Sequence, residues 1–315
     1  MRGEGGKRPQ GASPPFFDEK DGASMNWLQQ LLNGISVGSI YALIALGYTM
    51  VYGIVKLINF AHGDVFMLGA FIGFYAITVL HLGFIPAILL TMAVTSLIGV
   101  LIERVAYRRL RNSPRIAALT TAIGVSLFIE YTTIYVRGAQ PDVYPDLFGD
   151  RVIRVFGATT RVDTLVILLI AVLLMLLLQW IVHYTKIGKA MRAVSYDADA
   201  ARLMGISVDR TISWTFALGS ALAGAAGVIF GLYYTKIDPL MGLIPGLKAF
   251  VAAVMGGIGS IPGAMVGGLL LGLVETGVSA LGFSLFRDAV AFIILILILL
   301  FMPQGLFGKN VREKV

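Results

Sequence analysis

Residues 211–235 read TISWTFALGSALAGAAGVIFGLYYT, an unbroken run without a single charged side chain. About 20 consecutive apolar residues are enough for an α-helix to cross the hydrocarbon core of a bilayer. Comparable charge-free runs recur at residues 27–55, 65–102, 164–185, 249–274 and 289–308. The chain is therefore predicted to cross a membrane several times.

The overall composition supports the same conclusion. Of the 315 residues, 57% are hydrophobic and 14% are charged, which is more apolar surface than a soluble core of this length can bury. The alternation that a membrane β-barrel requires is absent, and helices are the other way to satisfy backbone groups in lipid. We expect an all-α polytopic helical bundle of about eight spans. The range is seven to ten, because two of the runs can hide a break or a tight hairpin.

Several functional classes are excluded by what the sequence lacks. Without cysteine there is no disulfide, thiolate metal site or cysteine nucleophile. The chain has no phosphate-binding loop, no serine-nucleophile elbow and no pair of histidines at zinc-binding spacing. We expect no enzymatic activity and no cofactor, so any energy from ATP comes from a partner. The net charge of +7 resides in short loops, which indicates membrane topology and no nucleic-acid partner.

The chain divides into three parts. Residues 1–24 are rich in Gly, Pro and charge, and we expect a disordered tail or the product of a misassigned start codon, with Met25 as the natural start. Residues 25–308 form the transmembrane domain, and residues 309–315 form a short tail.

Loops rich in Lys and Arg predict the orientation. Residues 103–115 and 183–210 are basic and are assigned to the cytoplasm. The connection 137–163 balances Arg against Asp and contains two prolines, so we assign it to the outside. The basic C-terminus is also placed inside, while the side of the N-terminus stays open.

An inside C-terminus requires an odd number of crossings after residue 235. Segments near 245–258, 262–282 and 288–302 supply three. The first is short for a full span, so we expect a broken or re-entrant element near 245–263.

A polar island at residues 195–210, SYDADAARLMGISVDR, predicts a short cytoplasmic helix at about 197–206. Asp197 is suited to cap its start, Asp199 favours the first turn, and Gly205 favours its end. Small apolar residues give it a compact face that fits a groove on another protein. The alternative is a helix resting on lipid, but its acids and lack of bulky anchors favour docking. The residues assigned to docking are Asp197, Asp199, Ala200, Ala201, Gly205 and Ile206.

Two further stretches interrupt the apolar runs. Asn59, His62 and Asp64 are polar at membrane depth, where such groups usually line a cavity or pathway. Equally, they can form a wet interfacial turn, and a helix broken at Gly63 reconciles the two interpretations.

The glycine-rich stretch 255–268 predicts irregular backbone, which membranes tolerate only where it is buried in protein or faces water. We expect a re-entrant element or short hairpin near a translocation path, with a compact external turn as the alternative. Glu275 is expected to face the bundle interior. The pathway candidates here are Gly256, Gly257, Gly259, Pro262 and Gly263.

Four motifs resemble a known family. DAARLMG at residues 199–205 resembles the coupling-loop motif of ABC importer permeases, with Asp where the general pattern has Glu. GYTMVYGIVKLINFAHGD at 47–64, AVMGGIGSIPGAM at 253–265 and MPQGLFG at 302–308 are similar to stretches of branched-chain amino acid ABC transporter permeases of the LivH family. The resemblance extends from about Met25 to the C-terminus.

This resemblance implies a permease in a bacterial inner-membrane importer. Its partners would be a second homologous permease, two ATP-binding subunits and a periplasmic binding protein that delivers leucine, isoleucine or valine. Motor closure would move the 197–206 helix as a lever. Related permeases handle urea, amides or sugars, so these solutes remain alternatives. Two rival functions belong to other classes of membrane protein. One is an ion-coupled secondary transporter, and the other is an intramembrane enzyme that uses Ser39 and His62.

Overall fold

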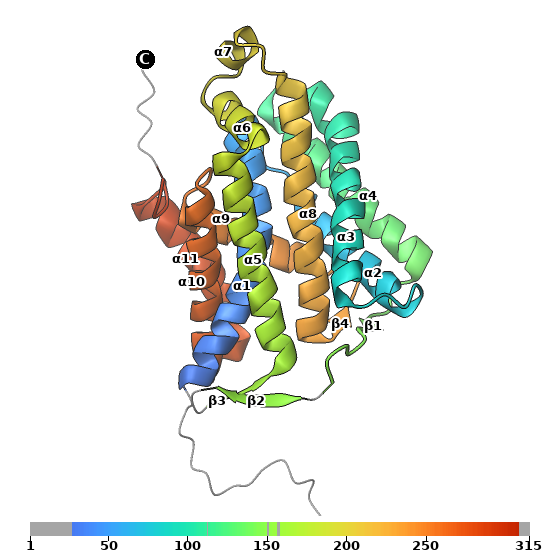
Figure 1. Ribbon diagram of the computed structural model, residues 1–315. Coiled ribbons are helices and arrows are strands. Elements are labelled where there is room, and N and C mark those ends of the chain that lie inside the picture. Colours follow the sequence, from blue (N-terminus) through green and yellow to red (C-terminus); the bar gives the residue numbers. More distant parts are fainter. Residues whose placement is uncertain (1–26, 112, 150, 156–157, 309–315) are drawn as a thin grey trace, which may run out of the picture.

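The computed structural model describes residues 27–111, 113–149, 151–155 and 158–308. The predicted tails at 1–24 and 309–315 lie outside the described residues. Eleven α-helices account for most of the described chain (Figure 1). Their bounds are α1 Trp27–Val55, α2 His62–Thr78, α3 Phe84–Ile102, α4 Arg115–Arg137, α5 Val162–Tyr184, α6 Lys186–Tyr196, α7 Ala198–Leu203, α8 Val208–Tyr234, α9 Leu243–Gly256, α10 Ile261–Ala280 and α11 Arg287–Phe301.

Shorter elements join these helices. Among the described residues, strands occur as two antiparallel pairs, β1 with β4 and β2 with β3. Their bounds are β1 Asp142–Val143, β2 Val152–Val155, β3 Ala158–Arg161 and β4 Lys236–Ile237. A π-helical turn and two 3-10 turns complete the list, as η1 Glu103–Tyr107, η2 Arg108–Leu110 and η3 Ser284–Phe286.

The prediction of a polytopic helical bundle is confirmed. Seven helical segments are long and apolar enough to cross a membrane, and α2 and α9 are shorter apolar helices. At 1.5 Å per residue, α2 is about 25 Å long and α9 about 21 Å, less than the roughly 30 Å of a hydrocarbon core. We call these two the half-helices. The expected short element near 245–263 corresponds to α9.

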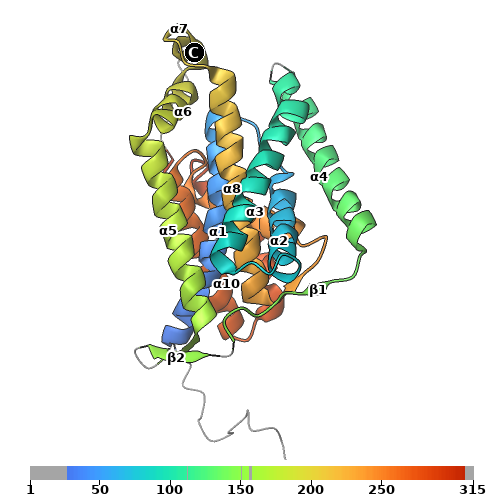
Figure 2. The ribbon, with the colours of Figure 1, turned by 45° about the vertical axis from the view of Figure 1, so that its right-hand side comes forward.

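Helices α1 and α8 form the centre of the bundle. Helix α8 packs against α1, α2 and α3, while α1 packs against α10, α8 and α9. Small residues allow the backbones of α1 and α10 to touch, because a Cβ on Gly268 would lie 2.4 Å from the Cα of Ala42. By contrast, α4 lies at the outside, against α2 and η1 (Figure 2).

The two ends of the bundle are formed by different elements. Helices α6 and α7 lie at one end, and the strands lie at the other (Figure 1). An ion pair between Arg111 and Asp209 ties the 103–114 segment to the beginning of α8, immediately after α7. The two segments assigned to the cytoplasm therefore share one end, called here the basic end. The connection assigned to the outside lies at the opposite strand end, where α1 begins against β3.

The break between α1 and α2 differs from its predicted position. Helix α1 ends before Lys56, whose φ of +57° is incompatible with a continuing helix, and residues 56–61 are largely irregular. Gly63, the predicted break, lies in the first turn of α2. A glycine is needed at position 63 because α2 packs closely against the chain before α9: a Cβ there would lie 2.5 Å from the carbonyl oxygen of Gly242.

Candidate functional site

Helix α7 begins and ends as the sequence predicted. The Oδ1 of Asp197 accepts hydrogen bonds from the backbone N–H groups of Asp199 and Ala200, both at 2.9 Å. At the other end, Gly205 has a φ of +82°, and the N–H of Ile206 donates to the carbonyl oxygen of Ala201 at 3.0 Å. This is a Schellman closure. A six-residue helix is thus closed at both ends by local hydrogen bonds.

The outward surface of α7 combines apolar side chains with an exposed ion pair between Asp199 and Arg202, and it differs from the predicted face. Tyr196, Leu203 and Met204 are 96%, 89% and 82% exposed, at the tip of the basic end (Figure 1). Ala200 is also exposed, whereas Ala201 is buried against the protein. Ala201 is therefore not part of the exposed surface of α7, because one residue step rotates a helix by about 100°. Exposed apolar side chains gathered on one tip typically mark an interaction site.

Helix α6, which the sequence analysis missed, supports α7 from below. The Thr185 side chain accepts a hydrogen bond from the N–H of Gly188 and caps α6. Met191 and Val194 are buried, so they anchor this amphipathic helix to the bundle. The signal was available, because a capping Thr precedes apolar residues at helical spacing.

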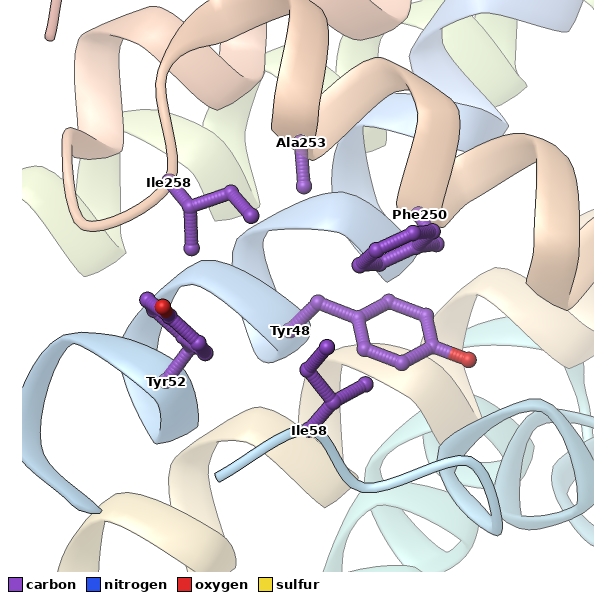
Figure 3. Close-up of a pocket in the computed structure, with 6 residues that line it drawn as sticks. All are labelled: Tyr48, Tyr52, Ile58, Phe250, Ala253 and Ile258. Atoms are coloured by element: carbon purple, nitrogen blue, oxygen red, sulfur yellow. The ribbon is translucent and has the colours of Figure 1, made fainter. Parts of the chain in front are cut away.

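A small interior pocket joins the two stretches that the sequence predicted as a pathway. Its lining comes from the end of α1, the 56–61 segment, α9 and the turn after α9 (Figure 3). The lining residues are Tyr48, Tyr52, Ile58, Phe250, Ala253 and Ile258. The space open to the centre of a water molecule is about 10 Å³, which is room for about one water. The pocket is thus closed to an amino acid in this conformation.

The polar residues of the 59–64 stretch are buried at this level. The Oδ1 of Asn59 accepts a hydrogen bond from the Tyr107 hydroxyl at 2.8 Å. The ring of His62 packs edge-on against Tyr48 with centroids 4.8 Å apart, and its Nε2 has no hydrogen-bond partner among the described residues. These side chains are therefore not in a wet interfacial turn.

Asp64 lies where the two half-helices begin. Its Oδ2 accepts a hydrogen bond from the Ser126 hydroxyl of α4 at 2.5 Å, and Glu130 of α4 lies beside it. The first turns of α2 and α9 meet through Gly63 and Gly246, because a Cβ on Gly246 would lie 3.0 Å from the Cα of Gly63. Two helix N-termini, each with a partial positive charge, thus converge next to a buried carboxyl group.

The glycine-rich stretch forms a tight turn at the basic end. Gly257 and Gly259 have φ of +99° and +97°, which residues other than glycine rarely adopt. Pro262 lies in the first turn of α10. The backbones of Gly256 and Gly263 lie so close together that a Cβ on either residue would overlap the carbonyl oxygen of the other. This turn lies beside the end of α1, because a Cβ on Gly53 would lie 3.5 Å from the Cα of Gly259.

The end of α9 is also held by the segment after α11. The N–H groups of Leu306 and Phe307 donate to the carbonyl oxygens of Met255 and Gly256, at 2.9 and 3.0 Å. The MPQGLFG motif thus satisfies backbone groups that a helix end leaves free.

A buried ionic cluster forms around Glu275, which is the one member of the cluster that the sequence analysis singled out. Glu275 is buried, as expected, and its carboxylate pairs with the Lys248 ammonium at 2.8 Å and accepts from the Tyr41 hydroxyl at 2.9 Å. Lys248 also pairs with Asp288 at 2.7 Å. The cluster joins α1, α9, α10 and α11, and its sequence signal was the position of Lys248 and Asp288 directly before the charge-free runs 249–274 and 289–308.

The residues considered for intramembrane catalysis do not form a nucleophile and base. The Ser39 hydroxyl donates to the carbonyl oxygen of Ile35 within its own helix at 2.7 Å. Within the described ranges, no group of three or more His, Cys, Asp or Glu side chains is arranged to hold a metal ion.

Comparisons with known proteins agree on one family. A family model described as branched-chain amino acid transport system / permease component matches residues 30–299. The chain is 45% identical to the high-affinity branched-chain amino acid transport system permease protein LivH of Salmonella typhimurium, over 92% of this chain and 98% of that protein. LivH of Escherichia coli K12 and BraD of Pseudomonas aeruginosa are each 44% identical over the same shares. No solved structure gives a significant match.

Proposed function

Because the chain belongs to the family of permease components of branched-chain amino acid transport systems, we propose that it carries leucine, isoleucine or valine inward across a bacterial inner membrane. It is the permease component of an ABC importer, and its role is transport. The chain contains no phosphate-binding loop, so the energy of ATP enters through partner subunits.

The observation that carries this proposal is the form of α7. It is a short helix closed at both ends, raised at the tip of the basic end, and it presents Leu203 and Met204 outward. A helix that inserts into a groove of another protein requires such a face. The proposed occupant of this face is an ATP-binding subunit, and two such subunits serve a pair of permeases.

Membrane orientation follows from the same end of the molecule. The basic end collects Lys and Arg from the 103–115 and 183–210 segments, which favours the cytoplasm. With this orientation the C-terminus is cytoplasmic, and α1 enters from the periplasmic side. The strand end then faces the periplasm, where the proposed amino-acid-binding protein delivers its cargo. A second, homologous permease completes the transmembrane part.

The proposed pathway runs past the interior pocket. Its lining of Ile58, Ala253 and Ile258 together with aromatic rings suits the aliphatic side chain of a branched-chain amino acid. The room for a single water means that this conformation is closed, as alternating access requires of one of its states. Asn59, His62, Asp64 and the glycines of the 256–263 turn border or support this region.

Reconstitution into liposomes tests the proposal. The complex of this chain with its partner permease and ATP-binding subunits should accumulate radiolabelled leucine when ATP is inside and loaded binding protein is outside. Unlabelled isoleucine and valine should compete, whereas urea and simple amides should not. Accumulation by this chain alone, driven by an ion gradient, would instead establish the secondary transporter.

A variant tests the docking assignment within the same assay. Ala200→Trp places an indole on the exposed face of α7 and should abolish the stimulation of ATPase activity by loaded binding protein. Lys189→Trp on α6 adds an indole at another exposed position of the basic end and serves as control. Unchanged stimulation in the Ala200 variant would remove α7 from the motor interface.

A further inference from the structure

The cytoplasmic end of α3 does not continue as an α-helix. It becomes the π-helical turn η1, Glu103–Tyr107, and π-helical turns occur frequently at functional sites. Both terminal residues of this turn are polar yet buried, with Glu103 fully covered and Tyr107 1% exposed. Burial of a carboxylate or a hydroxyl costs free energy unless hydrogen bonds or ion pairs compensate for it. The partners of Glu103 and Tyr107 are therefore informative.

Glu103 connects η1 to the beginning of α8. Its Oε2 accepts a hydrogen bond from the Ser213 hydroxyl at 2.8 Å, and its Oε1 pairs with the guanidinium of Arg111. The same guanidinium pairs with Asp209 at 2.5 Å. Arg108 also bridges the two elements, because it pairs with Glu103 at 3.4 Å and donates to the Ser213 hydroxyl at 3.1 Å. The first two turns of α8 are therefore bound to η1 by the Ser213 hydrogen bond and by two shared arginines, Arg108 and Arg111.

Tyr107 connects η1 to the pocket. Its hydroxyl donates to Asn59 at 2.8 Å, and Asn59 follows the pocket-lining Ile58 in the chain. Its ring packs against Phe216 of α8 with centroids 5.4 Å apart. The irregular 56–61 segment is thus held from the side of η1, through a buried hydrogen bond.

The contacts from α7 to the pocket are therefore continuous. Helix α8 begins at Val208, shortly after the Schellman closure at Gly205, so a displacement of α7 reaches Asp209 and Ser213 through few bonds. From Ser213 the displacement passes to Glu103 through their hydrogen bond, along η1 to Tyr107, and through the Tyr107 hydroxyl to Asn59. Chains of packed side chains and hydrogen bonds can carry energetic coupling between two sites, and a measured coupling energy is its proof.

We propose that η1 transmits motor movement to the pocket, with Glu103 and Tyr107 as positioning residues that couple α7 to the 56–61 segment. This inference rests on the proposed function of α7. When the ATP-binding subunits move α7, η1 shifts the Asn59 backbone and changes the access of the pocket to the cytoplasm. If Glu103 and Tyr107 served only to stabilise the fold, their substitution would lower the stability of the protein and leave the motor-dependent change in pocket access intact.

The absence of cysteine allows a direct test. In the reconstituted complex, Ile58→Cys places the single thiol of this chain in the pocket lining, and its labelling by a membrane-impermeant maleimide from the cytoplasmic side reports access. Trapping the motor with ATP and vanadate should change the labelling rate about tenfold, within the usual range of allosteric coupling. Adding Tyr107→Phe, which removes the donor to Asn59, should reduce this change to about twofold or less on the same scale.

Tyr184→Phe is the matched control, because Tyr184 is 73% exposed and removal of its hydroxyl should leave the response intact. Ser213→Ala removes the donor to Glu103 on the other side of η1 and provides a second variant, should Tyr107→Phe accumulate poorly. It should also weaken the response.

Three results would overturn the inference: a full response in Tyr107→Phe, a full response in Ser213→Ala, or a parent complex in which trapping leaves the labelling of Ile58→Cys unchanged. A double-mutant cycle adds a second criterion. Asp209 and Tyr107 belong to one connected chain of contacts, so Asp209→Asn and Tyr107→Phe should show non-additive effects on the leucine transported per ATP. Labelling does not depend on the solute, so a failure to transport leucine would contradict the proposed substrate alone.

Discussion

Replacement of Asp197 by alanine is the sharpest test of how α7 works. The Asp197 carboxylate accepts two backbone hydrogen bonds at 2.9 Å, and α7 has six residues, far too few to persist as an isolated helix. Loss of a capping side chain costs about 1 kcal/mol of helix stability. A change of that size lowers the ratio of folded to frayed α7 roughly fivefold.

The assay is the ATPase activity of the reconstituted complex, with and without loaded binding protein. Asp197→Ala should reduce the stimulated activity by at most about fivefold, because the folded fraction of α7 cannot fall by more than the ratio of folded to frayed helix does. Asn caps a helix as well as Asp does, so Asp197→Asn should keep nearly full stimulation. If Asp197→Ala behaves as the parent, the cap is irrelevant to docking. If Asp197→Asn fails as badly as alanine, the charge of the carboxylate matters and the capping argument is refuted.

Three further predictions concern packing, the buried charges and the pocket. Gly268→Ala should destabilise the protein by about 1–3 kcal/mol through overpacking against α1, whereas Gly277→Ala in the same helix has open space and should not lower the melting temperature in detergent. Lys248→Met should cost about 3–5 kcal/mol by removing the ammonium nearest the buried carboxylate of Glu275, and the double variant Lys248→Met with Glu275→Leu should recover most of the loss in thermal unfolding. Ile58→Trp should fill the pocket and stop leucine uptake while the ATP-binding subunits still co-purify, and Ile58→Val should transport normally; uptake by the Trp variant would exclude the pocket from the pathway.

Much of the fold could be predicted from the sequence because lipid imposes a simple rule on length and polarity. Each charge-free run became one helix or a pair of helices, and the run 65–102 contains the turn at residues 79–83 that separates α2 from α3. The bounds of α7 were predictable for a different reason: an N-cap and a C-terminal glycine act on the backbone within a few residues.

Pairs that are distant in the sequence were not predictable. The Tyr107 to Asn59 hydrogen bond and the Lys248 to Glu275 ion pair depend on how each helix is rotated and which helices are neighbours. A single sequence encodes the apolar character of a span, but in lipid that character does not select a partner. The misplaced break at Gly63 has a related cause, since the same residue type serves both chain breaks and close helix contacts.

The α1 and α10 contact has a consequence for how the protein is made. The glycine face of α1 leaves the ribosome first, yet the backbone that covers it, around Gly268, is synthesised near the end. During most of translation this notch on α1 faces lipid or a temporary neighbour. Completion of the bundle therefore awaits the last helices, and a nascent chain stalled before α10 should be a ready substrate for membrane quality-control proteases.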